Sequence, residues 1–212
     1  EGTRARLKMA LQARPGIMEI APYVGGEAEI PGMERVLRLA SNENALGPSP
    51  RAIEAYRELS DSLHRYPDGG ATALRKAIAD TLGLAADRIV CGAGSDELIS
   101  LLTRAYAGPG DEVLYSRHGF LMYPISAKGV GAQPVAVPER DLTADVDALL
   151  AAVTERTRIV FLANPNNPTG SYLPAEELAR LHKGLPASVL LVIDAAYAEY
   201  VEAEDYSDGT AL

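Results

Sequence analysis

Short apolar segments alternate with helical segments along most of the chain, and this alternation limits the folds that are open to it. Strand-length apolar runs occur at residues 88–91, 112–115, 134–137, 158–163 and 189–193. Helical patterns occur at residues 52–60, 71–82, 96–107, 145–153 and 175–185. Strands that alternate with helices of this length favour βαβ crossovers and a mainly parallel sheet. The predicted fold class is therefore α/β.

Residues 1–50 differ from the rest of the chain in composition and pattern. They are rich in Gly and Pro turns and have too few apolar residues for a core of their own. We expect an N-terminal arm at residues 1–50, lying over a body or a partner, and one α/β domain at residues 51–212.

Charge and composition exclude several classes of protein. The formal net charge is −9, from 20 basic and 29 acidic residues, so the basic footprint of a nucleic-acid-binding protein is missing. No apolar run reaches the ~18 residues of a membrane span. The start of the chain has no apolar core of a secretory signal. The single Cys91 and three scattered histidines have no metal-ligand spacing, so we expect no metal site and a cytoplasmic location.

Three polar segments follow predicted strands. They are residues 92–97, residues 164–170 and the segment that begins at Asp194. In an open α/β sheet, ligands bind beyond the carboxyl ends of the strands. We therefore expect all three segments at one edge of the sheet.

Each segment has a functional and an ordinary interpretation. Residues 92–97 (GAGSDE) open a helix and could bind an anion, or could form a plain turn with Ser95 as the N-cap. Residues 164–170 (NPNNPTG) could hold an Asn amide rigidly towards a ligand, with one X-Pro bond cis, or could be an irregular loop. Asp194 ends an apolar strand, so its charge needs a partner such as a ligand cation, unless it caps a helix. Tyr197 can reach the same site.

Four further motifs occur with these segments in a specific order. They are RPG at 14–16, APY at 21–23, LASNENALGPSP at 39–50 and RYPD at 65–68. In order and spacing the whole set resembles the histidinol-phosphate aminotransferases, a family of fold type I enzymes that depend on pyridoxal 5′-phosphate (PLP). The resemblance extends from Pro15 to Tyr200. It implies a PLP-binding large domain at residues 51–212, with helices on both faces of its sheet, that continues beyond Leu212. It also implies that residues 1–50 form the arm and a small-domain or substrate-lid segment.

The resemblance also implies roles for individual residues. Gly94, Ser95 and Asp96 would hold the cofactor phosphate, and Phe120 would stack on the pyridine ring. Asn167 and Tyr197 would bond the phenolic oxygen of the cofactor, and Asp194 would pair with its pyridine nitrogen. In a homodimer, Tyr66 would reach the phosphate of the neighbouring subunit. Tyr23 and Asn44 would contact a phosphorylated amino substrate. The segment Gly25-Gly26-Glu27, Ala45 and Ala195 depart from the pattern of the family, which weakens the substrate assignment more than the cofactor assignment.

The lysine that forms a Schiff base with PLP is not recognisable in this sequence. Its four lysines are Lys8, Lys76, Lys128 and Lys183, and none has the Ser-x-Lys setting of the family. We therefore expect no catalytic residue up to Leu212, and we expect the lysine and the carboxylate-binding arginine to follow it.

The implied reaction moves an amino group between L-glutamate and imidazole acetol phosphate, giving L-histidinol phosphate and 2-oxoglutarate in histidine biosynthesis. An aromatic amino acid aminotransferase and a related PLP decarboxylase remain alternatives. A non-catalytic fragment that binds a phosphate ligand or a partner is the alternative from another class. A nucleotide-binding domain would account for residues 92–97 alone.

Overall fold

The structure is a computed structural model that describes residues 13–22, 31–33, 36 and 41–212. It falls into two compact units. The sheet unit consists of Glu1–Ala21 with Gly92–Leu212, and the helical unit is Pro22–Cys91. Within the described residues, no helix combines the length and the apolar character that crossing a membrane requires.

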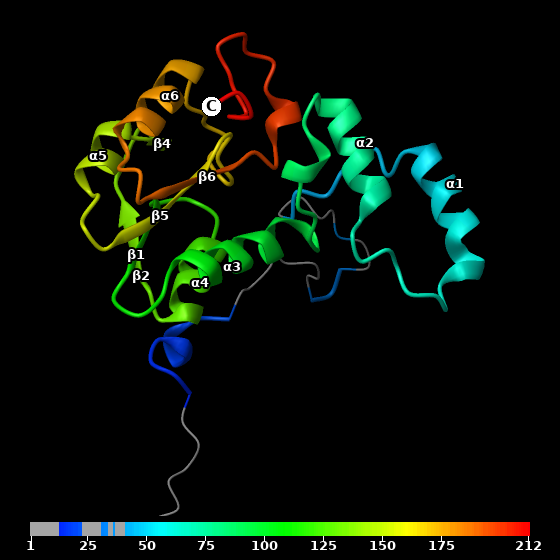
Figure 1. Cartoon of the computed structure of the whole chain (residues 1–212), viewed down its shortest axis with the longest axis horizontal. Helices are drawn as coiled ribbons and strands as arrows, with labels where there is room; N and C mark the ends of the chain where they lie inside the picture. The colour runs from blue at the N-terminus through cyan, green and yellow to red at the C-terminus, as the bar shows by residue number, and fades with distance from the viewer. Residues whose placement is uncertain (1–12, 23–30, 34–35, 37–40) are drawn as a thin grey trace, which may run out of the picture. The chain divides into compact units, whose positions relative to one another are not determined.

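The sheet unit is built on four parallel strands (Figure 1). They are β1 (Glu112–Ser116), β2 (Gln133–Val137), β5 (Thr157–Ala163) and β6 (Leu190–Asp194), in the order β2-β1-β5-β6. All three neighbouring pairs are parallel. The α/β class and the strands expected at 112–115, 134–137, 158–163 and 189–193 are confirmed.

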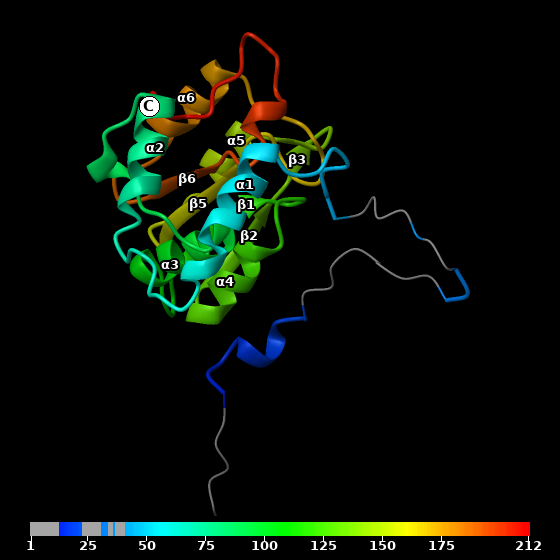
Figure 2. The ribbon, with the colours of Figure 1, turned by 90° about the vertical axis from the view of Figure 1, so that its right-hand side faces the viewer.

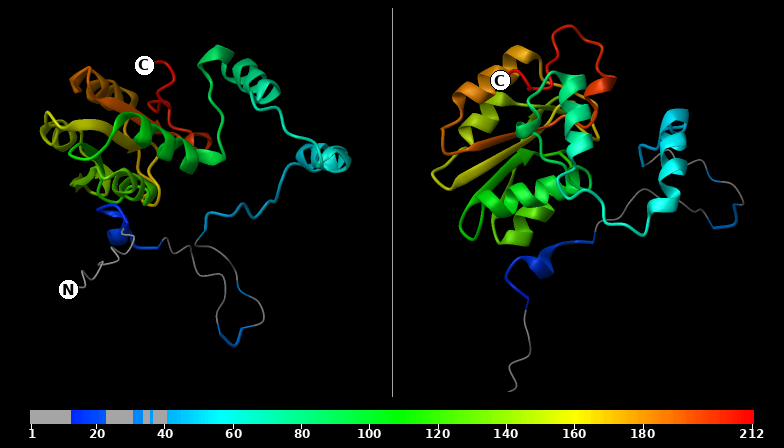
Figure 3. Two further views of the ribbon diagram at one scale, coloured as in Figure 1. Left: turned by 60° about the horizontal axis from the view of Figure 1, so that its bottom comes forward. Right: turned by 45° about the vertical axis from the view of Figure 1, so that its right-hand side comes forward.

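Helices cover both faces of this sheet, as Figures 2 and 3 show. Alternate strand residues point to opposite faces. Val113, Ile159 and Phe161 therefore pack with Ile99 and Tyr123 of α3 (Gly94–Tyr106) and α4 (Met122–Val130). Leu114, Val160 and Leu162 point the other way. They pack with α5 (Val146–Ala151) and α6 (Ala175–Gly184). The sheet thus has two apolar cores, one on each side.

The strand order places a switch point between β1 and β5. From β1 the chain passes through α4 to β2 on one side, and from β5 it passes through α6 to β6 on the other. At such a point the loops after two central strands diverge and leave a crevice where ligands bind. Here those loops carry Phe120 after β1 and Asn167 after β5.

Two elements of the sheet unit are not evident in the sequence pattern. Helix α4 contains Pro124 and Gly129, which argue against a helix. Pro124 is the third residue of the helix, however, where a backbone N–H has no partner within the helix, so its absence costs little. The second element is a hairpin of β3 (Glu139–Arg140) and β4 (Thr143–Ala144), whose strands are too short to show periodicity.

Part of the N-terminal segment contacts α4. The 3-10 helix η1 (Ile17–Glu19) lies against it, and the Arg14 guanidinium donates a 2.6 Å hydrogen bond to the Gly129 carbonyl. The Lys128 ammonium donates to the carbonyl of Glu19 at 3.3 Å.

The helical unit contains α1 (Pro50–Leu59) and α2 (Thr72–Leu82), close to their expected positions, and the short turns η2 (Ser60–Ser62) and η3 (Ala86–Arg88). The strand expected at residues 88–91 is wrong. Arg88 ends η3, and Ile89 has extended dihedral angles without belonging to a strand. Ile and Val favour that backbone conformation, but a strand also needs a hydrogen-bonded neighbour, and none occurs in the described residues.

Candidate active site

Five residues predicted from the sequence line one small pocket of about 70 Å³ in the sheet unit. They are Ser95, Phe120, Asn167, Asp194 and Tyr197. They come from the start of α3, the loops after β1 and β5, the end of β6 and the turn that follows it. The three polar segments therefore meet, as expected, although the first of them does not follow a strand.

Asp194 is held by two hydrogen bonds. Its Oδ2 accepts a 2.8 Å bond from the hydroxyl of Tyr123, and its Oδ1 accepts a 3.3 Å bond from the backbone N–H of Ala196. Within the described residues it forms no ion pair. Asp194 does not cap a helix, because the next helical turn, η4 (Ala198–Tyr200), has Tyr197 as its N-cap. Its charge is thus oriented at the pocket and available to a cationic ligand.

Tyr123 is the residue of this site that the sequence did not reveal. Its side chain is fully buried and stacks on Phe161, with ring centroids 4.8 Å apart and an interplanar angle of 2°. Burial raises the pKa of the Tyr123 phenol, and the charge of Asp194 and the hydrogen bond to it raise the pKa further. The hydroxyl therefore stays protonated and acts as a donor. The only local sequence signal for this role of Tyr123 is its spacing of about one helical turn from Phe120. That spacing can be recognised only if α4 is already known to be a helix.

Phe120 lies at the end of a tight turn after β1. Its ring meets that of Tyr123 edge-on, with centroids 6.0 Å apart at 88°. In the turn, the backbone N–H of Gly119 donates a 2.7 Å bond to the carbonyl of Ser116, and an added Cβ at Gly119 would lie 2.8 Å from that oxygen. The turn therefore requires glycine at position 119. Its conformation sets the position of the next residue, Phe120.

Ser95 lies in the first turn of α3 and is not its N-cap. The N-cap is Ala93, and the helix begins at Gly94, whose φ of +78° suits glycine. The Glu97 carboxylate accepts a 2.6 Å bond from the backbone N–H of Ala93. First-turn N–H groups have no acceptor within the helix, so this end can bind an anion. Gly94 and Asp96 flank Ser95 in that turn but do not line the pocket.

The loop after β5 gives its three asparagines different tasks. Asn164 is buried and structural, since its side chain donates to the Leu173 carbonyl and accepts from the Leu173 N–H. Asn166 bonds to neighbouring loop atoms, and Asn167 lines the pocket. Both X-Pro bonds, Asn164–Pro165 and Asn167–Pro168, are cis, whereas one was expected.

The structure does not test the roles predicted for three further residues. Tyr66 belongs to the helical unit and its side chain is 100% exposed. Asn44 belongs to the same unit, and its side chain accepts a 2.9 Å bond from the N–H of Leu46. Tyr23 lies outside the described residues. Their roles stay predictions.

Comparison with known proteins agrees with this geometry. The model of the family aminotransferase class I and II matches residues 34–209. Histidinol-phosphate aminotransferases of Rhodospirillum centenum and Paramagnetospirillum magneticum are 71% and 69% identical, over 93% and 94% of this chain. The chain spans about half the length of these relatives, 55% in both cases. The resemblance expected from the sequence is confirmed.

Solved structures show the same fold. The histidinol-phosphate aminotransferase of Sinorhizobium meliloti, in complex with pyridoxal-5′-phosphate, is 35% identical with a TM-score of 0.74, covering 77% of this chain and 45% of that one. An aromatic aminotransferase of Pyrococcus horikoshii is 26% identical with a TM-score of 0.67, covering 76% and 48%. The chain belongs to the class I and II aminotransferases.

Proposed function

We propose that the pocket binds PLP. The observation that carries this proposal is the set of groups that meet there: an anion-binding helix end at Ser95, an aromatic ring at Phe120, two polar groups at Asn167 and Tyr197, and a carboxylate at Asp194. PLP offers a matching phosphate, an aromatic ring, a phenolic oxygen and a basic pyridine nitrogen. The donor set therefore fits this cofactor. The PLP complex of a related structure also supports it.

Bound PLP supplies an electron sink for chemistry at the α carbon of an amino acid. The residues of this chain bind and orient it. Asp194, held by Tyr123, keeps a proton on the pyridine nitrogen by charge pairing. Phe120 holds one face of the ring, and Gly94, Ser95 and Asp96 contribute backbone N–H groups for the phosphate. Asn167 and Tyr197 donate to the phenolic oxygen.

The proposed reaction exchanges an amino group between L-glutamate and imidazole acetol phosphate, with L-histidinol phosphate and 2-oxoglutarate as products. The names and the high identity of the relatives support this substrate over an aromatic amino acid. In the same proposal the protein works as a cytoplasmic homodimer in which Tyr66 reaches the cofactor of the partner. Tyr23 and Asn44 would contact the substrate, and residues after Leu212 would supply the Schiff-base lysine.

The test uses the full-length polypeptide that carries this segment. After addition of PLP and borohydride, which reduces a Schiff base to a stable amine, intact mass should show one PLP per chain. Peptide mapping should place the adduct on a lysine after Leu212. Absence of an adduct would contradict the cofactor assignment.

The substrate is tested with the same protein by comparing amino donors. With 2-oxoglutarate as acceptor, L-histidinol phosphate should be used with a higher kcat/KM than L-phenylalanine. The reverse order would favour an aromatic aminotransferase, and release of carbon dioxide without transamination would favour a decarboxylase.

A further inference from the structure

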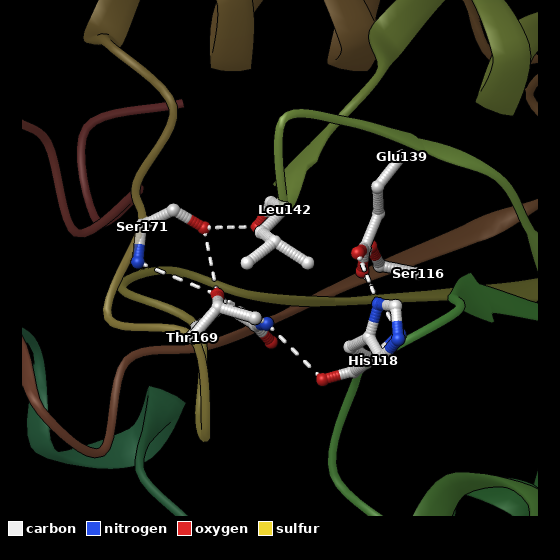
Figure 4. Close-up of polar contacts among 7 residues, drawn as sticks. Ser116, His118, Glu139, Leu142, Thr169 and Ser171 are labelled. Carbon is white, nitrogen blue, oxygen red and sulfur yellow. Dashed lines mark hydrogen bonds and ion pairs between the residues drawn. The ribbon is translucent and has the colours of Figure 1, made fainter.

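A nearly buried carboxylate outside the pocket is used by none of the steps above. The side chain of Glu139, on β3, is only 3% exposed. It accepts three hydrogen bonds: from the hydroxyl of Ser116 at 2.5 Å, from the backbone N–H of His118 at 2.9 Å, and from Nδ1 of His118 at 2.7 Å. Figure 4 shows the imidazole of His118 directed at this carboxylate.

The hydrogen bonds keep Glu139 charged. Burial alone raises the pKa of its carboxyl, but the bonds from Ser116 and His118 outweigh burial and leave the pKa below its ordinary value. Ser, His and Glu together also suggest a nucleophile, yet the geometry does not support one. A serine nucleophile must donate to the histidine that acts as its base. Ser116 and His118 both donate to Glu139 instead. The cluster therefore holds the backbone of the loop that leads from Ser116 to Phe120.

That loop is in turn bonded to the loop after β5. The side-chain amide of Asn166 donates a 3.2 Å bond to the carbonyl of His118 and a 2.8 Å bond to the hydroxyl of Thr169. His118 is two residues before Phe120, and Asn166 is next to Asn167. The two loops that border the switch point are thus joined a short distance from their pocket-lining residues.

The β3–β4 hairpin also reaches the second loop directly. The hydroxyl of Ser171 donates a 2.7 Å bond to the carbonyl of Leu142, in the turn between β3 and β4, and lies 2.8 Å from the hydroxyl of Thr169 (Figure 4). The hairpin therefore holds the first loop through Glu139 and the second loop through Leu142.

We propose that Glu139 is a positioning residue that, through His118 and Asn166, sets the spacing between Phe120, which would stack on the PLP ring, and Asn167, which would bond its phenolic oxygen. The proposal rests on the proposed function, because it assigns PLP to this pocket. Glu139 itself does not touch the cofactor.

The experiment compares Glu139→Ala and Glu139→Gln with Glu112→Ala in the full-length protein. Glu112 is a matched control, because it is also a buried carboxylate that accepts hydrogen bonds from Thr154 and Arg156. It is the first residue of β1, whereas Ser116, which bonds Glu139, is the last. Glu139→Ala should raise the PLP dissociation constant about tenfold or more, since loss of an outer hydrogen-bond partner costs metal sites about 10–100-fold in affinity or activity. It should also change the visible circular dichroism per bound PLP, which reports ring orientation.

We expect the effects of the three variants on PLP binding to differ in size. Glu139→Gln keeps one acceptor oxygen and should fall between Glu139→Ala and the unsubstituted protein. Glu112→Ala should lower the melting temperature but leave the PLP dissociation constant and the dichroism unchanged. Equal effects of Glu139→Ala and Glu112→Ala on cofactor binding would overturn the proposal, because they would point to general destabilisation.

A second variant tests whether Glu139 acts through the loop contact. Asn166→Ala should also raise the PLP dissociation constant, and the double variant should be no worse than the larger single effect, as expected for residues in one network. If the two single fold-changes in the PLP dissociation constant multiplied in the double variant, Glu139 and Asn166 would act independently. That result would overturn the proposed coupling of Glu139 to the second loop through Asn166.

A readout without cofactor separates this inference from the proposed function. In the PLP-free protein, Glu139→Ala should speed amide hydrogen exchange in residues 117–121 and also in residues 164–171, although the hydrogen bonds of the Glu139 side chain go to Ser116 and His118. Unchanged exchange in the second loop would overturn the inference. Failure of the unsubstituted protein to bind PLP would instead overturn the proposed function, and exchange would still decide whether the two loops are coupled.

Discussion

The hydroxyl of Tyr123 donates a 2.8 Å hydrogen bond to Oδ2 of Asp194, joining residues 71 positions apart in the chain. The same phenol ring stacks on Phe161 in β5 and meets Phe120 edge-on. The buried side chain of Tyr123 therefore contacts both Asp194 and Phe120, the carboxylate and the aromatic residue that we propose bind the cofactor. A fixed donor limits the rotation of the carboxylate, which is how supporting hydrogen bonds pre-organise a site.

Replacing Tyr123 with Phe removes only this hydroxyl. We expect the free energy of unfolding to fall by about 1.5–3 kcal/mol, the range of a hydrogen bond to a charged group. PLP should also bind more weakly, because Asp194 loses its fixed orientation. Urea unfolding and equilibrium dialysis measure the two effects. Tyr115→Phe is the control, since the hydroxyl of this neighbouring ring makes no hydrogen bond to the described residues. Equal losses in both variants would argue against a special role of the Asp194 contact.

Asp194 can be tested with two substitutions that separate charge from packing. Asp194→Asn keeps an acceptor for Tyr123 but removes the charge, so transamination by the full-length protein should fall by about a hundredfold or more with little change in stability. Asp194→Ala should lose as much activity and also about 1–3 kcal/mol of stability, because it leaves the buried Tyr123 hydroxyl without its acceptor. Initial rates and thermal unfolding provide the readouts. Near-normal activity of Asp194→Asn would show that the carboxylate does not serve the cofactor.

Gly119→Ala should destabilise the protein by about 1–3 kcal/mol, because the new Cβ meets a backbone oxygen that cannot move without shifting the turn. Gly129→Ala, within α4, provides a control that should instead increase the stability of the protein. Among the described residues, no atom other than those of its own helix backbone and chain neighbours lies within 4 Å of the added Cβ, and alanine in a helix is favoured over glycine by about 1 kcal/mol. Chemical unfolding of both variants tests this pair. A neutral Gly119→Ala would mean that the turn after β1 adapts easily.

Stability should depend on pH through Glu112. Hydrogen bonds from Thr154 and Arg156 hold the pKa of the Glu112 carboxyl below its ordinary value of 4.5, despite burial. A lowered pKa contributes stability that is present above pH 4.5 and is lost as the pH falls through the folded-state value. Glu112→Gln should therefore be less stable than the unsubstituted protein at pH 6, with the difference narrowing below pH 4.5. Urea midpoints at pH 6, 5, 4 and 3.5 measure it, and parallel curves would contradict the assignment.

Local sequence patterns predict most of the elements but not those whose stability comes from their surroundings. The strands β1 and β5 are recognisable because helices on both faces bury their apolar runs, and the apolar residues of β2 and β6 also pack on these two cores. Residues 88–91 have an equally suitable composition, yet they form no strand because a ladder needs a neighbour. Helix α4 shows the converse, since packing of Tyr123 and Ala127 on the sheet outweighs its poor helix propensity.

Amino-acid order is enough to predict the α/β class, because strand periodicity and turn chemistry are local properties. It also predicts that the polar segments meet at one edge, because a parallel sheet brings the carboxyl ends of its strands together. The family, and with it the roles of the five residues that line one pocket, follows from the resemblance of the ordered motifs to known enzymes. The supporting contacts depend on tertiary structure. Tyr123 with Asp194, and Glu139 with His118 and Asn166, are pairings between side chains far apart in the chain. A hydrogen bond requires atoms to meet within a few tenths of an ångström, and only the packed fold sets such distances.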